Sequence, residues 1–254
     1  MNALDCESLE STYASIETIL EITQDKIKKV FKELDFDSYQ NGSLNPNCDP
    51  EKEIYYHLKE HTRTEPIIDK VYWFHLTRTV KTNDFSGGIL PLGQVVNSIW
   101  DFLFTLVKDE ITLNEWKKIQ GNLENGRSAK LYNLKVNKQN LWGPYAFLIR
   151  ELAFKTEEIG SHDYLYSPEI VEDISICVRK KFSIDLLSRY RNATSPCIVK
   201  FVSYDVNMIN LPRVLNYLYT AYHGKRFNLE CHACFDGKGV KIPKDRIEKI
   251  EFPE

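Results

Sequence analysis

The first 35 residues place apolar side chains at the spacing of an amphipathic helix. These positions recur three, four or seven residues apart, at Leu9, Tyr13, Ile16, Leu20, Ile27, Val30, Phe31 and Leu34. The pattern predicts helix in two pieces that meet near Thr23. Residues 36–49 are polar and rich in turn-forming side chains, which indicates a loop. Asp49-Pro50-Glu51 then predicts an N-cap followed by Pro at the first helical position, with a helix that runs to about His61.

A second pattern begins at residue 67. The run Ile67–Arg78 contains the apolar stretch Val71–Phe74 and predicts a buried strand. A helical stripe follows, formed by Val95, Val96, Ile99, Trp100, Leu103 and Leu106. Thr112 and Glu115 have the spacing of a capping box, and Ile111 and Trp116 flank it as a hydrophobic staple. These positions predict another helix after residue 112.

Beyond residue 140 the chain contains both strand and helix patterns, and most of the strand patterns lie near the C-terminus. We predict strands at Tyr145–Ile149, Ile198–Val206, Arg226–Phe235, Val240–Ile242 and Arg246–Phe252, a helix that starts at Ser167-Pro168-Glu169, and a helix at Leu211–Tyr222 closed by Gly224. Because helices come first and strands cluster late, the order favours an α+β fold over an alternating βαβ fold. We expect an N-terminal helical region at residues 1–66 and a second domain at residues 67–254.

Composition narrows the class of protein. The chain has 254 residues, of which 43% are hydrophobic and 12% aromatic, so it can form a sizeable core. With a formal net charge of -3, the chain as a whole does not attract nucleic acid electrostatically. Local basic patches remain open as acceptor surfaces, at Arg127–Lys138, Arg179–Lys181 and Arg189–Arg191.

The chain shows no signal for membranes or secretion. No apolar run approaches the roughly 20 residues that span a bilayer, and the first residues lack the basic and apolar regions of a signal peptide. The six cysteines are scattered, and we expect them to be reduced thiols in the cytoplasm.

Three polar side chains follow directly after the apolar stretch of the predicted strand at residues 67–78. His75, Thr77 and Arg78 present an imidazole, a hydroxyl and a guanidinium at that point. Such a group suits a polar ligand that carries phosphates. Gly87-Gly88 permits a sharp turn into the apolar segment Ile89-Leu90-Pro91-Leu92.

His-x-Thr followed by Gly-Ile-Leu-Pro resembles the first strand of the ADP-ribosyltransferases, and the resemblance extends over residues 67–252. It implies a split antiparallel β-sheet core with helices, and NAD as the substrate. It also implies that His75 contacts the adenosine ribose, that Thr77 meets the nicotinamide amide and that Arg78 pairs with the pyrophosphate. The alternative is a core strand that ends in a hydrogen-bonded His and a surface Arg.

The resemblance also calls for an aromatic ring that stacks on nicotinamide. Tyr145 is the first candidate for this ring, and Tyr164 and Tyr166 are the alternatives. The plain alternative for Tyr145 is a core aromatic residue.

A carboxylate is the remaining catalytic group that the resemblance implies, because it stabilises the developing positive charge of the ribose. Glu230, on the predicted strand at residues 226–235, is the first candidate, against the alternative of an outward-facing strand residue. Glu169 and Glu172 are its rivals, although acidic residues also favour the first turn of a helix. The chain departs from the family at Lys238-Gly239, where a Glu often precedes Val-x-Ile-Pro.

The motif Cys231-His232-Ala233-Cys234 invites comparison with a zinc site. A structural site needs four ligands, usually from two pairs, and a second pair is missing. In a strand, residues 231 and 234 would also point to opposite faces. We therefore predict no metal site.

These observations favour a mono-ADP-ribosyltransferase toxin of a toxin–antitoxin or anti-phage defence system. Its acceptor would be a macromolecule, either nucleic acid such as RNA or DNA, or protein. The N-terminal helices would bind an antitoxin or another partner, or brace the NAD cleft. Two alternatives stay open: a non-catalytic interaction or sensor subunit on a degenerate version of the fold, and a nuclease that uses His75, Arg78 and a second His.

Overall fold

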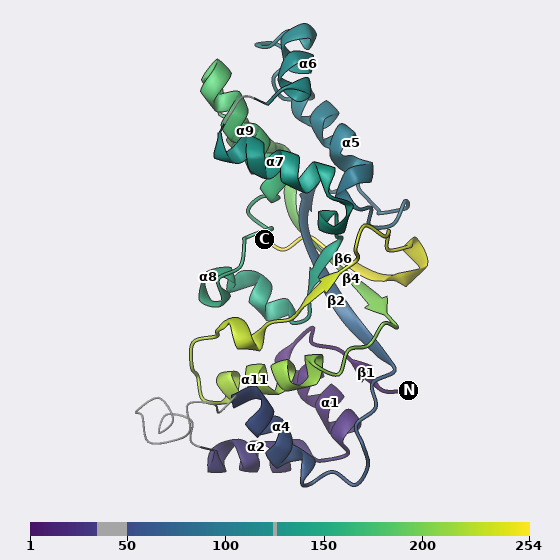
Figure 1. Cartoon of the computed structure of the whole chain (residues 1–254). Coiled ribbons are helices and arrows are strands. Elements are labelled where there is room, and N and C mark those ends of the chain that lie inside the picture. Colours follow the sequence, from purple (N-terminus) through teal and green to yellow (C-terminus); the bar gives the residue numbers. More distant parts are fainter. Residues whose placement is uncertain (35–49, 124–125) are drawn as a thin grey trace. The chain divides into compact units, whose positions relative to one another are not determined.

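The computed structural model describes residues 1–34, 50–123 and 126–254, and it has a mixed α/β fold, as Figure 1 shows. The expected α+β class is confirmed at this level. An open sheet has the strand order β5-β3-β2-β4-β6, and β1 also pairs with β2. The strands are β1 (Ala3–Leu4), β2 (Lys70–Thr79), β3 (Tyr145–Phe147), β4 (Ser195–Ser203), β5 (Cys234–Asp236) and β6 (Ile247–Glu251).

Strand β2 is the longest strand in the sheet. Its start pairs in parallel with β1, where Ala3 lies beside Lys70. Further along, it pairs antiparallel with β3, where Phe74 lies opposite Phe147. The predicted strand at residues 145–149 is therefore shorter than expected, because Ile149 leaves β3 and forms an isolated bridge with Cys6.

The chain divides into two compact units, and β2 contributes to both. The first unit comprises Met1–Phe74, Phe147–Ser161 and Phe201–Cys234. The second comprises His75–Ala146, His162–Lys200 and Phe235–Glu254. The predicted helical region, residues 1–66, lies wholly within the first unit, together with two later segments of the chain.

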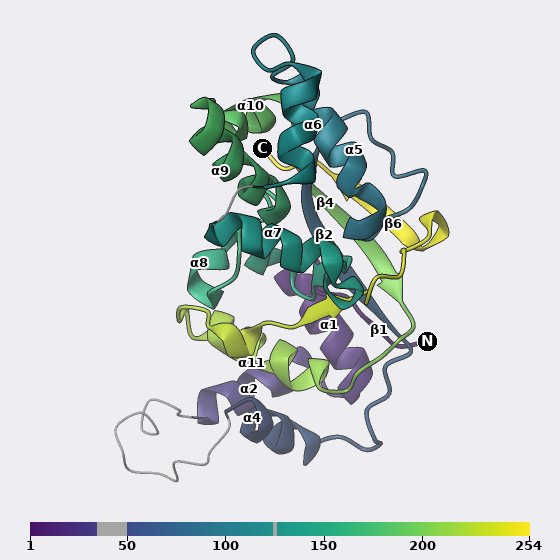
Figure 2. The same cartoon turned by 45° about the horizontal axis from the view of Figure 1, so that its top comes forward.

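The described part of the first unit contains four helices that pack together, as Figure 2 shows: α1 (Leu9–Leu20), α2 (Gln24–Glu33), α4 (Pro50–Lys59) and α11 (Asn210–Tyr222). The predicted break near Thr23 is confirmed, because the Thr23 side chain caps α2 by accepting a hydrogen bond from the Lys26 amide. Apolar side chains such as Ile16, Ile27 and Ile54 are fully buried. The predicted loop at residues 36–49, including Asp49, lies outside the described residues.

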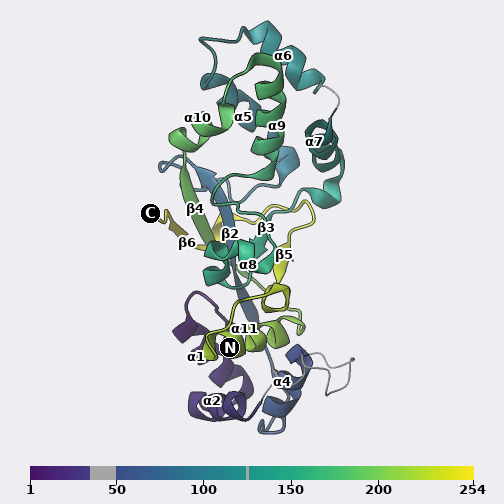
Figure 3. The ribbon, with the colours of Figure 1, turned by 90° about the vertical axis from the view of Figure 1, so that its left-hand side faces the viewer.

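The second unit has its own helical core. It contains α5 (Leu92–Thr105), α6 (Leu113–Gly121), α7 (Arg127–Asn137), α9 (Glu169–Phe182) and α10 (Leu186–Ala193), which are visible together in Figure 3. Trp100 packs edge-on against Trp116 with ring centroids 5.0 Å apart, and its indole N–H donates to the Tyr132 hydroxyl. The predicted capping box is confirmed, with hydrogen bonds in both directions between Thr112 and Glu115.

Helices α7 and α10 were not predicted from the sequence. Helix α7 follows Gly126 and has no side-chain cap, and most of its exposed positions are polar. Its buried face consists of Ala129 and Tyr132 alone, so the apolar stripe is too narrow to recognise. Shorter elements complete the chain: 3₁₀ turns at Gln139–Leu141, Arg150–Phe154, Leu229–Cys231 and Lys244–Arg246, and the one-turn helix α8 (Thr156–Ile159).

The predicted strand Arg226–Phe235 is wrong. Its centre is the 3₁₀ turn Leu229–Cys231, and only its end enters β5. The reason lies in α11, because Arg213 donates hydrogen bonds to the carbonyls of Leu229 and His232 and holds the segment in a turn. The predicted strand Val240–Ile242 is reduced to an isolated bridge, in which Ile242 exchanges two 2.9 Å hydrogen bonds with Ile89.

No helix within the described ranges is both long and apolar enough to cross a membrane.

Candidate functional site

His75 lies on β2 with one ring nitrogen held by the neighbouring strand. Its Nδ1 is 2.7 Å from the backbone carbonyl oxygen of Tyr145. A carbonyl can only accept, so Nδ1 carries the proton and donates it. Burial lowers the pKa of His75, and the hydrogen bond to Tyr145 opposes part of that shift. The imidazole is therefore neutral near pH 7, and its Nε2 presents a lone pair.

Thr77 follows His75 on the same face of β2, because successive side chains of a strand alternate in direction. Leu76 between them is buried, whereas His75 and Thr77 are half-buried. Tyr145, which opens β3, exposes 36% of its surface. The strand pair thus brings together an imidazole, a hydroxyl and the backbone of the candidate stacking residue.

The turn before β3 requires glycine. Gly143 has a φ of +62°, which other residues adopt rarely. A Cβ at this position would lie 2.9 Å from Cδ2 of Tyr145 and 2.7 Å from its backbone nitrogen. The absence of a side chain at Gly143 therefore lets the Tyr145 ring fold back over the turn.

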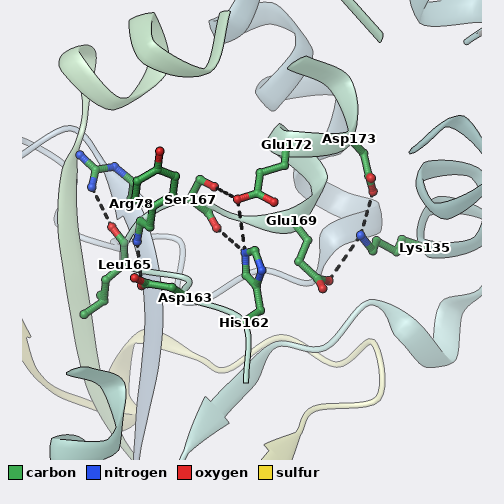
Figure 4. Close-up of polar contacts among 10 residues, drawn as sticks. Arg78, Lys135, His162, Asp163, Leu165, Ser167, Glu169, Glu172 and Asp173 are labelled. Atoms are coloured by element: carbon green, nitrogen blue, oxygen red, sulfur yellow. Dashed lines mark hydrogen bonds and ion pairs between the residues drawn. The ribbon is translucent and has the colours of Figure 1, made fainter. Parts of the chain in front are cut away.

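Arg78 is an integral part of the second unit. Its guanidinium donates to the carbonyls of Leu165 (2.7 Å), Arg191 (2.9 Å) and Thr194 (2.8 Å), and to the hydroxyl of Thr194 (3.2 Å). Figure 4 shows the bond to Leu165. A pyrophosphate ligand would compete with these four bonds, so the geometry favours an anchoring role for Arg78 over the predicted contact with phosphate.

The two alternative stacking residues pack against other rings or cations. Tyr164 lies edge-on to the His162 ring, with centroids 4.8 Å apart. The guanidinium of Arg191 lies 3.7 Å from the centre of the Tyr166 ring. Tyr145 is the candidate whose backbone carbonyl accepts a hydrogen bond from His75.

The rival carboxylates, Glu169 and Glu172, both have structural partners at the start of α9 (Figure 4). Glu169 lies 3.4 Å from the Lys135 ammonium. Glu172 accepts a hydrogen bond from the Ser167 hydroxyl and lies 3.8 Å from Nε2 of His162. That same nitrogen is 2.7 Å from the Ser167 carbonyl. Ser167 is fully buried, so this His-Ser-Glu group braces the entry to α9 and presents no accessible nucleophile.

Lys135 also links α7 to α9 through Asp173. The Lys135 Nζ to Asp173 Oδ2 distance is 2.8 Å, and the Asp173 side chain is only 7% exposed. Burial raises the pKa of Asp173, an effect that Lys135 opposes and that Glu169 and Glu172 increase. The ammonium therefore stabilises a carboxylate that would otherwise be costly to bury.

Replacing Lys135 with methionine should lower the free energy of unfolding by about 2 kcal/mol at pH 8. A carboxyl whose pKa is raised in the folded state binds more protons when folded, so stability falls as pH rises above the unfolded pKa of about 3.9. Without Lys135 the pKa of Asp173 rises further, and the loss should shrink when the pH is lowered to 4.5. Urea unfolding at the two pH values measures this difference. A pH-independent loss, or an equal loss for the exposed Lys130→Met on the same helix, would contradict the assignment.

Glu230 lies on the 3₁₀ turn Leu229–Cys231 and is exposed. The late strand that suggested it as the catalytic acid does not form there. Glu230 belongs to the first unit, whereas His75 belongs to the second. Its catalytic role therefore stays a prediction that rests on the resemblance.

Gly239 lies where the resemblance leads us to expect a glutamate. Its backbone conformation favours glycine over other residues. Its φ is +81°, and its N–H donates to the Gly143 carbonyl over 2.7 Å. A Cβ at this position would lie 3.0 Å from both Cγ and the carbonyl oxygen of Gln139. A glutamate at this position would be strained, because its side chain would require a backbone conformation that favours glycine.

Over the described part of the chain, no three His, Cys, Asp or Glu side chains are grouped closely enough to hold a metal ion. No protein-family model, curated protein or solved structure matches this chain.

Proposed function

We propose that this chain is an NAD-dependent mono-ADP-ribosyltransferase that modifies a macromolecule as the toxin of a toxin–antitoxin or anti-phage defence system in the cytoplasm. The observation that carries the proposal is the anchored imidazole of His75. Its Nδ1 is fixed by Tyr145, which leaves Nε2 as an oriented acceptor on the face of β2 that Thr77 shares.

The donors and acceptors on this face suit the polar parts of NAD. A neutral Nε2 accepts a hydrogen bond from a ribose hydroxyl, and the Thr77 hydroxyl can donate to or accept from a carboxamide. The partly exposed Tyr145 ring offers a flat surface for nicotinamide. We do not include Arg78 among the NAD-binding residues, because its guanidinium donates four hydrogen bonds within the protein.

The resemblance also calls for a carboxylate that acts on the reacting ribose, and Glu230 is our candidate for this role. The exposed carboxylate is available to a substrate, whereas Glu169 and Glu172 have Lys135 and Ser167 as partners. A carboxylate accelerates nicotinamide release by stabilising the positive charge that develops on the ribose.

One alternative has specific support: a non-catalytic interaction subunit on the same fold. Gly239 occupies the position of the family's glutamate with a backbone that disfavours any side chain.

The basic residues Arg179–Lys181 give only weak support for an RNA acceptor. They occupy the last turn of α9, where positive charge stabilises the helix dipole.

The test is transfer of label from NAD. The purified chain is incubated with NAD labelled in the adenylate and a cell extract divided into protein, RNA and DNA fractions, with Glu230→Gln as the matched control. Label that enters one fraction, and is lost with the variant, would support the transferase and identify its acceptor class. Transfer that persists with Glu230→Gln would remove Glu230 from the mechanism. Absence of both transfer and NAD binding by calorimetry would favour the interaction subunit.

A further inference from the structure

Cys234, the first residue of β5, has an imidazole against its sulfur. Nε2 of His232 lies 2.9 Å from Sγ of Cys234. The thiol is exposed, whereas His232 is only 7% exposed and packs on the Phe147 ring with centroids 4.2 Å apart. A buried imidazole is thus in contact with an exposed cysteine.

The surroundings of His232 determine which of its nitrogens carries the proton. Burial lowers the pKa of His232 to about 4, with Arg213 adding to the effect, so the ring is neutral at pH 7. Its Nδ1 is buried and has no hydrogen-bond partner among the residues that the structure describes. A buried N–H without an acceptor is rarer in proteins than an unused lone pair. The proton therefore resides on Nε2, which donates toward the Cys234 sulfur.

Arg213, on helix α11, contacts the backbone of the segment before Cys234. Arg213 donates to the His232 carbonyl over 2.9 Å and to the Leu229 carbonyl over 3.0 Å, and Glu51 lies 3.8 Å from its Nε on the other side. The hydrogen bond that His232 donates favours the thiolate of Cys234 over its thiol, and the thiolate is the nucleophilic form.

The other described cysteines have the opposite environment. Cys6, Cys177, Cys197 and Cys231 are buried. Burial raises the pKa of Cys197 to about 12 and also raises that of Cys231. Cys48 lies outside the described residues. Cys234 is therefore the cysteine in the described ranges that combines access with an activating partner.

We propose that Cys234 is a reactive thiol, activated by His232, that forms a mixed disulfide with low-molecular-weight disulfides. The Cys234 thiolate attacks one sulfur of the disulfide, and a new S–S bond forms as the original S–S bond breaks. The other half leaves as a thiolate with the electron pair. Cys234 is oxidised in this step, and the departing sulfur is reduced.

The test uses the reduced full-length chain and glutathione disulfide at pH 7. We expect a glutathionyl adduct on Cys234, found by intact-mass spectrometry and peptide mapping, that is absent with Cys234→Ser and unchanged with Cys48→Ser. His232→Leu should slow the reaction about threefold, since a larger thiolate fraction is partly offset by its lower nucleophilicity. His232→Gln, which returns an N–H near the position of Nε2, should recover most of the rate. The absence of an adduct on Cys234, or an unchanged rate with His232→Leu, would overturn the proposal.

A second measurement needs no variant. The rate of Cys234 alkylation by iodoacetamide, followed by peptide mapping across pH 5–10, should reach half its maximum at least one unit below the ordinary thiol value of about 8.5. A midpoint at or above that value would overturn the proposal, whatever the variants do.

Discussion

Replacing Arg78 with methionine is expected to lower the free energy of unfolding by about 4 kcal/mol. Methionine fills much of the same volume but leaves three carbonyls and one hydroxyl without the donors that Arg78 supplies. Thr194, which accepts two of those bonds, is 8% exposed, so water replaces the lost donors poorly. The loss is measured by urea unfolding followed by circular dichroism.

Arg189→Met is the matched control for Arg78→Met. Arg189 pairs with Glu110 at the surface and donates to the Leu106 carbonyl over 3.1 Å. An exposed pair of this kind contributes little to stability, because water screens both charges. If Arg78→Met costs no more than Arg189→Met, the guanidinium does not anchor the second unit, and its assignment to a phosphate ligand regains support.

Much of the helical structure could be predicted because its signals are local. The Thr23 cap, the Thr112–Glu115 box and the stripe around Trp100 each lie within one or two turns of chain. The strand β2 could be predicted for the same reason, since its apolar run is continuous. Each of these features depends on residues that are close together in the sequence, so the sequence alone is enough to predict it.

The errors arise where a distant residue decides the local conformation. Residues 226–235 have the composition of a strand, but Arg213, on a different helix, holds two of their carbonyls in a turn. Arg78 has the chemistry of a phosphate ligand, but its acceptors lie more than 80 positions away in the chain. The residues Cys231–Cys234 were considered as zinc ligands on a strand, but Cys231 ends a 3₁₀ turn, whereas His232 is extended and lies against Cys234, two residues further on.

Asparagine and glutamine at position 75 should separate the two roles of the imidazole. The amide nitrogen of Asn can occupy the place of Nδ1 and donate to the Tyr145 carbonyl, but Asn supplies nothing at the place of Nε2. His75→Asn should therefore keep the stability of the protein within about 1 kcal/mol and reduce NAD-dependent transfer by about 100-fold. His75→Gln, whose amide reaches the place of Nε2, should retain more of the activity and lose more of the stability.

The pH dependence of NAD binding provides an independent check on His75. Burial lowers the pKa of this residue below its ordinary value of about 6.5, so the imidazole stays neutral as the pH falls from 8 to 6.5. Calorimetry should show constant NAD affinity over that range and weaker binding only at lower pH, where protonation removes the Nε2 lone pair. If affinity changes through pH 6.5–8, or if Asn and Gln at position 75 leave transfer equally unaffected, then Nε2 does not contact the substrate. His75 would then serve only to pin β2 to β3 through the Tyr145 carbonyl.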